Sequence, residues 1–75
     1  MIKEHDRVVL LKDIVEEGLK AGDVGTVVHI YRVGEAFEVE FMTLDGGTVA
    51  VVNVLSSHVR RVSGRDVTHA REVAT

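Results

Sequence analysis

Residues 22–28, Gly-Asp-Val-Gly-Thr-Val-Val, constrain the fold of this chain more than any other segment. Two glycines flank an Asp-Val pair and precede a run of β-branched residues, which pack well on a pleated sheet. The pattern predicts a sharp turn from a loop into a long strand over residues 24–31. Both faces of that strand carry apolar residues, and Gly25 permits a close backbone approach. We therefore expect the strand to bend and to serve two sheets of a small barrel.

Four further strands are predicted along the chain. Residues 7–11 form a Val-rich run too short for a stable helix. Residues 36–42 alternate, with Phe37, Val39 and Phe41 on the inward face. Residues 48–53 and 58–62 complete the set, with a 3₁₀ turn expected over residues 54–57. Gly34 and the Asp45-Gly46 pair are typical of tight hairpin turns, so consecutive strands from residue 24 to residue 53 should pair directly.

The other segments are a loop and a tail. Residues 12–23 mix charges with isolated apolar residues, and Gly18 would end a helix there, so we expect a long loop whose apolar side chains return to the barrel. The chain thus predicts an all-β fold, a small five-stranded SH3-like barrel over residues 1–62. Residues 63–75 form a C-terminal tail for which a short helix capped by Asp66, an extra strand and a frayed end all stay open.

Composition excludes several classes of protein. The chain has 75 residues and no cysteine, which excludes disulfides and thiolate chemistry. It has no apolar run near the ~20 residues that span a bilayer, and its charged beginning lacks the apolar core of a signal peptide. We expect a cytoplasmic protein.

Four blocks of the sequence resemble a known family. They are residues 7–13, residues 17–28 with the glycine pair, residues 37–41 with Phe-Glu-Val-Glu-Phe, and residues 45–52. Over residues 5–62 the chain resembles the bacterial domain of unknown function family 4926, which implies an SH3-like barrel and no established role. The glycine-valine block is also similar to the KOW motif, which implies RNA binding through basic loops. The corresponding loops here carry Asp23, Glu35 and Asp45 against a single Arg32, which departs from that motif.

Residues able to support catalysis or bind a metal are few. Glu38 and Glu40 lie two strand steps apart, about 7 Å, as on an ordinary solvated strand face. The four histidines lack the spacing of metal ligands, although His29 and His58 could meet across the barrel. We assign no catalytic residue, no metal and no cofactor.

The charges are unevenly distributed. Residues 1–57 carry ten acidic and five basic residues, whereas residues 58–75 carry four arginines and two acidic residues. The arginines either pair with the acidic body or bind a partner.

Tyr31 alone provides too little aromatic surface for a proline-rich peptide groove or for stacking of nucleic-acid bases.

We hypothesise a non-catalytic protein-interaction module that acts through an exposed strand edge or through residues 12–23. Its acidic charge suits a basic partner such as a toxin nuclease, as in an antitoxin or immunity protein, because complementary charge speeds association. The alternatives are weak, KOW-like nucleic-acid binding and an accessory barrel of an enzyme complex. A homodimer formed by strand pairing or tail exchange is also expected. The candidate partner-binding residues are Glu16, Glu17, Tyr31, Arg60, Arg61 and Arg65.

Overall fold

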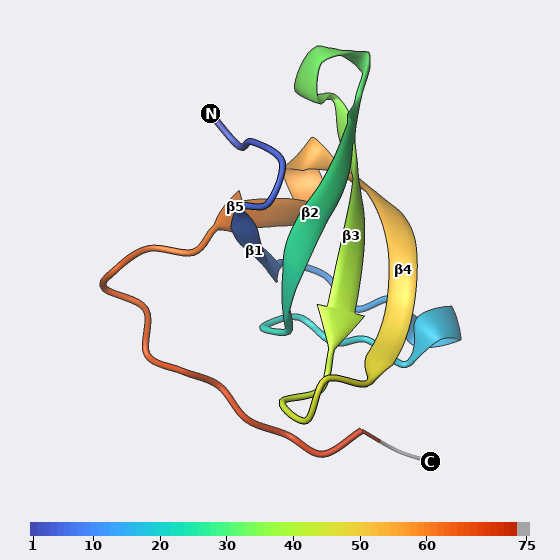
Figure 1. The fold of residues 1–75 in the computed structure, drawn as a ribbon, viewed down its shortest axis with the longest axis vertical. Helices are drawn as coiled ribbons and strands as arrows, with labels where there is room; N and C mark the ends of the chain where they lie inside the picture. The colour runs from blue at the N-terminus through green and yellow to red at the C-terminus, as the bar shows by residue number, and fades with distance from the viewer. Residues whose placement is uncertain (74–75) are drawn as a thin grey trace.

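Five antiparallel strands form one curled sheet in the computed structural model, which describes residues 1–73 (Figure 1). The strand order is β4-β3-β2-β1-β5, and the sheet curls into a barrel that is not closed. The elements in chain order are β1 (Arg7–Leu10), η1 (Val15–Glu17), β2 (Val24–Tyr31), η2 (Arg32–Gly34), β3 (Ala36–Met42), β4 (Thr48–Leu55), η3 (Ser56–His58) and β5 (Val59–Arg61), where η marks a 3₁₀ turn. The predicted all-β, five-stranded SH3-like architecture is confirmed.

The strand bounds differ from the prediction mainly at β4. Strands β2 and β3 occupy the predicted residues, and β1 ends one residue early. Strand β4 continues past Asn53 because Val54 is buried opposite Phe37, so the inward alternation of the strand persists to its end. The 3₁₀ turn and β5 therefore begin later than predicted, at Ser56 and Val59.

The core lies between the two halves of the curled sheet. Strand β3 contributes Phe37, Val39 and Phe41 to it, as the alternation predicted. The residues of the core cluster come from every strand and from one loop position: Val8, Leu10, Leu19, Val27, Phe37, Val39, Phe41, Ala50, Val54 and Val59.

Strand β2 joins the two halves of the sheet. Its beginning pairs with β1, and almost its whole length pairs with β3. The register shifts between Val27 and His29, so Val28 is an extra residue at a bulge. This irregularity interrupts the simple two-residue alternation expected from the sequence and places Ile30 opposite the inward-facing Phe37. The strand pairs with β1 and β3 within one sheet, whereas the sequence analysis expected it to serve two sheets.

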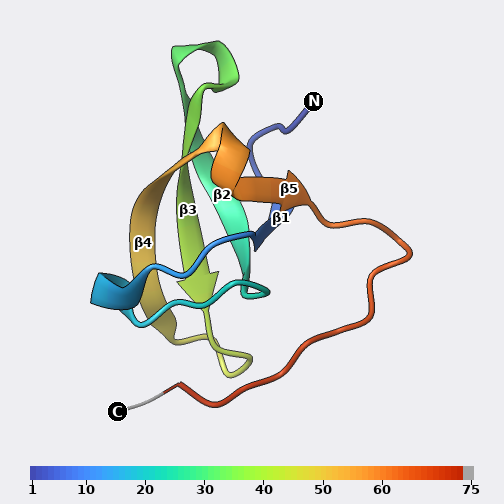
Figure 2. The same cartoon turned by 180° about the vertical axis from the view of Figure 1, so that it is seen from behind.

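The loop between β1 and β2 folds back onto the barrel as predicted. Gly18 ends the η1 turn in a left-handed conformation, with φ 69°, and donates a hydrogen bond to the Val15 carbonyl. Ile14 and Leu19 then pair as an isolated antiparallel bridge, which directs Leu19 into the core. Seen from behind, the loop and η1 lie on the same side as β4 (Figure 2).

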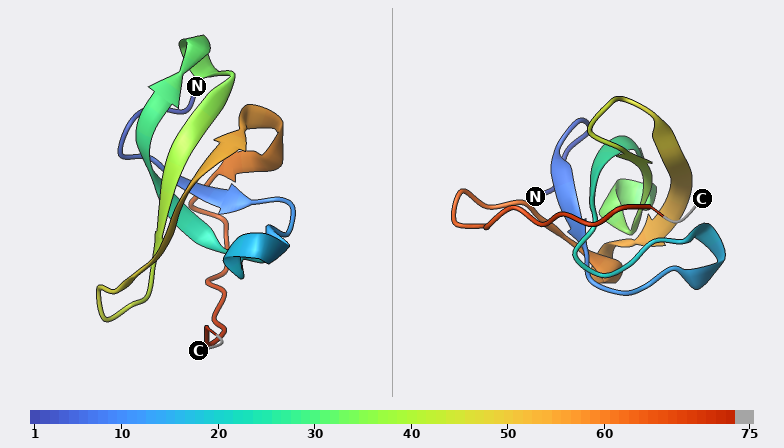
Figure 3. Two further views of the ribbon diagram at one scale, coloured as in Figure 1. Left: turned by 90° about the vertical axis from the view of Figure 1, so that its right-hand side faces the viewer. Right: turned by 90° about the horizontal axis from the view of Figure 1, so that it is seen from below.

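The tail is neither a helix nor a strand in the described residues 62–73. It leaves β5, swings outward and returns across one end of the barrel (Figure 3). Asp66 does not cap a helix; it accepts hydrogen bonds from the Ser63 N–H and from Arg60, which closes a local turn. Of the three conformations that the sequence left open, the short helix and the extra strand are absent from residues 62–73, and residues 74–75 lie outside the described chain.

Gly25 is required by close packing inside the barrel. A Cβ atom at this position would lie 2.5 Å from Val39 Cγ1 and 2.9 Å from the Glu40 carbonyl oxygen. We predict that Gly25→Ala lowers the free energy of unfolding by about 1 to 3 kcal/mol, because overpacking forces the backbone to shift. Urea denaturation measures the change. The control is Gly64→Ala, whose new methyl group meets open space; equal stability of the two variants would contradict the prediction.

Candidate interaction site

Asp23 is the one buried charged residue in the described part of the chain. It lies immediately before β2, and its backbone carbonyl accepts the Leu10 N–H at 2.9 Å. Its carboxylate accepts the Lys20 N–H at 2.9 Å, while its own N–H donates to the Lys20 carbonyl. These bonds fold residues 20–23 into a tight turn and hold the loop against the end of β1.

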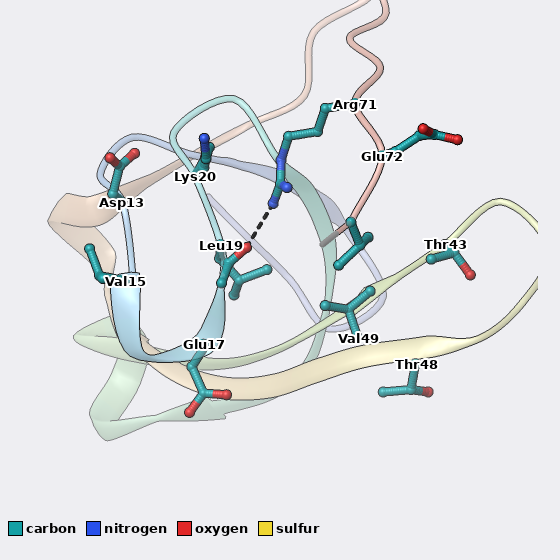
Figure 4. A pocket seen from close by; sticks show the side chains of 12 residues that line it. Asp13, Val15, Glu17, Leu19, Lys20, Thr43, Thr48, Val49, Arg71 and Glu72 are labelled. Carbon is teal, nitrogen blue, oxygen red and sulfur yellow. Dashed lines mark hydrogen bonds between the residues drawn. The ribbon is translucent and has the colours of Figure 1, made fainter. Parts of the chain in front are cut away.

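Arg71 reaches from the tail to this carboxylate. Its Nε donates to Asp23 Oδ1 at 2.8 Å, and its Nη2 donates to Asp23 Oδ2. The same Nη2 donates to the Gly18 carbonyl at 2.9 Å, the hydrogen bond drawn as a dashed line in Figure 4. A forked guanidinium on a carboxylate is a strong, charge-assisted arrangement. It fixes the tail to the β1–β2 loop across 48 positions of sequence.

His69 adds a second tail contact to the same carboxylate. Its Nε2 lies 3.4 Å from Asp23 Oδ1, and its side chain is about half exposed. The ring also lies against Gly22. The tail thus contacts the turn before β2 through two side chains.

The charge state of Asp23 follows from these contacts. Burial by itself raises the pKa of the carboxyl, but the hydrogen bonds from Arg71 and the Lys20 N–H, with the Arg71 charge and His69, lower its pKa below the usual value. The hydrogen bond from Arg71 to Asp23 raises the pKa of the guanidinium, and the charge of Asp13 adds to this effect. The carboxylate therefore stays ionised to low pH.

Two grooves separate the β1–β2 loop from β4. The first, about 590 Å³, lies beside Arg71 (Figure 4). Leu19 and Val49 supply apolar surface to it, and Asp13 and Glu17 supply acidic side chains. The second, about 340 Å³, continues toward the far end of β4, where Asp13 and Glu16 face Leu55 and His58. An acidic loop therefore faces the free edge of the sheet.

The candidate residues predicted from the sequence are spread over the molecule. Glu16 and Glu17 lie in η1, where they line the second and first grooves respectively. Tyr31 ends β2 at the η2 hairpin, and its ring packs edge-on against His29 with 4.5 Å between centroids. The structure therefore places Glu17 in the groove beside Arg71, Glu16 in the second groove and Tyr31 in the hairpin region.

The arginines mostly contact carboxylates of the chain itself. Arg60 makes a forked pair with Asp66, and Arg61 Nε lies 3.4 Å from Asp6. Arg65 lies exposed in the turn that follows β5, without a salt bridge inside residues 1–73. Sequence reasoning missed the pairing of Asp23 with Arg71; the only signal was that an acidic residue stands inside a glycine-flanked strand start.

Within residues 1–73, no three His, Cys, Asp or Glu side chains gather where they could hold a metal ion. His29 instead lies 3.9 Å from Glu4, and Glu40 accepts a hydrogen bond from Thr48. Residues 1–73 contain no helix with the length and apolar character needed to cross a membrane.

Comparison with known proteins gives one match. The family model described as a domain of unknown function, DUF4926, matches residues 4–61. No curated protein and no solved structure matches the chain. The matched segment contains the barrel and Asp23 and ends at the last residue of β5, so Arg71 lies outside it.

The lowered pKa of Asp23 predicts acid sensitivity. Because the pKa of Asp23 in the folded state lies below its unfolded value of ~3.9, the stability that its carboxylate contributes is complete above that pH and is lost as the pH falls through the folded pKa. We predict that the free energy of unfolding drops less between pH 6 and pH 3 in Asp23→Asn than in the unmodified chain. Urea denaturation at the two pH values measures the drop, with Glu16→Gln as the control. An unchanged drop in Asp23→Asn would contradict the prediction.

Proposed function

Because the chain belongs to the DUF4926 family of unknown function, we propose a function from its geometry: it is a non-catalytic protein-interaction module that binds a basic protein partner. The binding surface is the acidic β1–β2 loop together with the edge of β4 that faces it. One observation carries this proposal. Exposed acidic side chains line both grooves beside β4, next to a buried carboxylate that already holds a guanidinium.

Charge supports the choice of partner. Residues 1–57 carry twice as many acidic as basic residues. Three of the arginines, Arg60, Arg61 and Arg71, contact carboxylates within the described chain. Glu16 and Glu17 form no salt bridge within residues 1–73, so they keep their charge available to a partner. Complementary charge of this kind speeds association and selects against acidic partners.

The shape of the β4 edge supports a macromolecular partner. β4 ends the strand order, so one of its edges has no strand partner in the described chain. The strand is eight residues long, contains no charged residue, and exposes about half of Val51 and Leu55. An edge with these properties readily pairs with an extended segment from another chain.

A small acidic module of this kind suits neutralisation of a basic protein, such as a toxin nuclease, in the manner of an antitoxin or immunity protein. We place it in the cytoplasm of a bacterial cell. The same β4 edge supports the expected homodimer, whereas weak nucleic-acid binding and an accessory role in an enzyme complex remain the competing proposals.

A capture experiment tests the interaction module. The tagged full chain is compared with Glu16→Lys/Glu17→Lys and with the control Glu35→Lys/Glu38→Lys, which has the same charge change just after η2 and on β3. We expect a basic protein to be retained from native lysate of the source cell by the unmodified chain and the control, at least tenfold less by the loop variant, and to elute with salt. Mass spectrometry identifies it.

Two kinds of result would contradict the proposed interaction module. If the two charge-changed variants lose the protein equally, the loop is not the binding surface. If no protein is retained above a tag-only control, or if retention disappears after nuclease treatment, the module binds no protein directly and the proposal fails.

A further inference from the structure

We propose that Asp23 and the Gly18 carbonyl form a guanidinium-binding site for an arginine-bearing, extended segment of the partner, and that Arg71 occupies this site in cis until the partner displaces it. The inference rests on the proposed interaction function and adds the chemistry of the partner and its regulation by the tail.

The acceptors of the site are positioned without help from the tail. The Lys20 N–H bonds Asp23 Oδ2, and the Leu10 N–H bonds the Asp23 carbonyl. Gly18 is held by its left-handed conformation and by its hydrogen bond to the Val15 carbonyl. Every one of these bonds lies within residues 10–23, so the three oxygen acceptors are fixed by the barrel and its loop. A preformed site of this kind binds with little ordering cost.

Arg71 is the main attachment of the tail to this site. Within residues 66–73, no backbone-to-backbone hydrogen bond joins the tail to the barrel, and its side-chain contacts at the site come from Arg71 and His69. An incoming arginine would restore every hydrogen bond that Arg71 gives up. The tail therefore competes mainly through its high local concentration, which for a short flexible tether is in the millimolar range.

The tail is also an imperfect ligand for its own groove. The residue after Arg71 is Glu72, which lines the first groove together with Asp13 and Glu17 (Figure 4). The three acidic side chains outnumber the two basic ones of this groove, Lys20 and Arg71, and an excess of like charge reduces affinity at an interface. A partner segment with a basic residue after its arginine would remove this excess. Beyond it, Leu19 and Val49 offer apolar surface along the start of β4.

A peptide titration tests the site directly. The probe is a synthetic peptide of residues 63–73, added to the ¹⁵N-labelled full chain carrying Arg71→Ala. We expect saturable amide shifts around Gly18, Lys20 and Asp23, and binding at least tenfold weaker to the unmodified chain, whose own arginine occupies the site. The matched control Arg65→Ala removes an arginine elsewhere in the same tail and should bind the peptide as weakly as the unmodified chain.

Peptide variants identify the recognised group. A probe with Arg71→Ala should lose at least tenfold in affinity, and a probe with Glu72→Lys should bind more tightly than the native sequence. If the full chain carrying Arg71→Ala is poorly folded, the titration is repeated with the full chain carrying Arg71→Gln, which keeps a long neutral side chain. Three results would overturn the proposal. They are equal binding of the peptide that lacks Arg71, amide shifts confined to another face of the barrel, and no binding of the native peptide to the full chain carrying either Arg71→Ala or Arg71→Gln.

The peptide titration and the capture experiment can fail independently of each other. If the partner is retained through Glu16 and Glu17 but the peptide does not bind, the module stands and the guanidinium site fails. If the peptide binds and no partner is captured, the site stands and the proposed function fails. If both hold, Arg71→Ala should retain more partner than the unmodified chain.

Discussion

A buried carboxylate at the start of β2 organises one end of this barrel. Removing a charge from water is costly unless hydrogen bonds and an opposite charge compensate it. Asp23 receives both, from the Lys20 N–H within its own turn and from the guanidinium of Arg71 in the tail. The turn sets the path of the β1–β2 loop, the loop forms one wall of both grooves, and the arginine determines where the tail crosses the barrel.

The rigid barrel and the candidate site are built by different means. Gly25 brings β2 close against β3, and the apolar residues of all five strands fill the core. The site instead uses a loop turn, a backbone carbonyl and a tail residue. The segment matched by the family model includes Asp23 and Gly18 but not Arg71. The barrel therefore carries the acceptors, and this chain's tail supplies the donor that fills them.

Local patterns in the sequence predicted the strands well. Alternation in residues 36–42 and the glycine-flanked start of β2 identified both strands with their bounds, because each signal is contained within a few neighbouring residues. The end of β4 was missed because the polar Asn53 resembles a strand end, whereas packing of Val54 against the core decides the length. The tail conformation stayed open because side-chain contacts of Asp66, His69 and Arg71, and no helical or strand hydrogen bonding, determine its path.

Sequence reasoning found the acidic loop but not the site within it. Glu16 and Glu17 follow directly from composition and charge, since an exposed loop carries them. The pairing of Asp23 with Arg71 links residues 48 positions apart and has no local signature. Only the folded arrangement shows that one arginine of the basic tail is already used.

The most direct test of this account is a double-mutant cycle on Asp23 and Arg71. The free energy of unfolding is measured for the full chain, Asp23→Asn, Arg71→Ala and the double variant. A forked ion pair on a mostly buried carboxylate predicts a favourable coupling energy, with the double variant losing less stability than the two single variants together. Effects that add to within about 0.5 kcal/mol, as for independent sites, would contradict the claim that Asp23 binds the guanidinium of the tail.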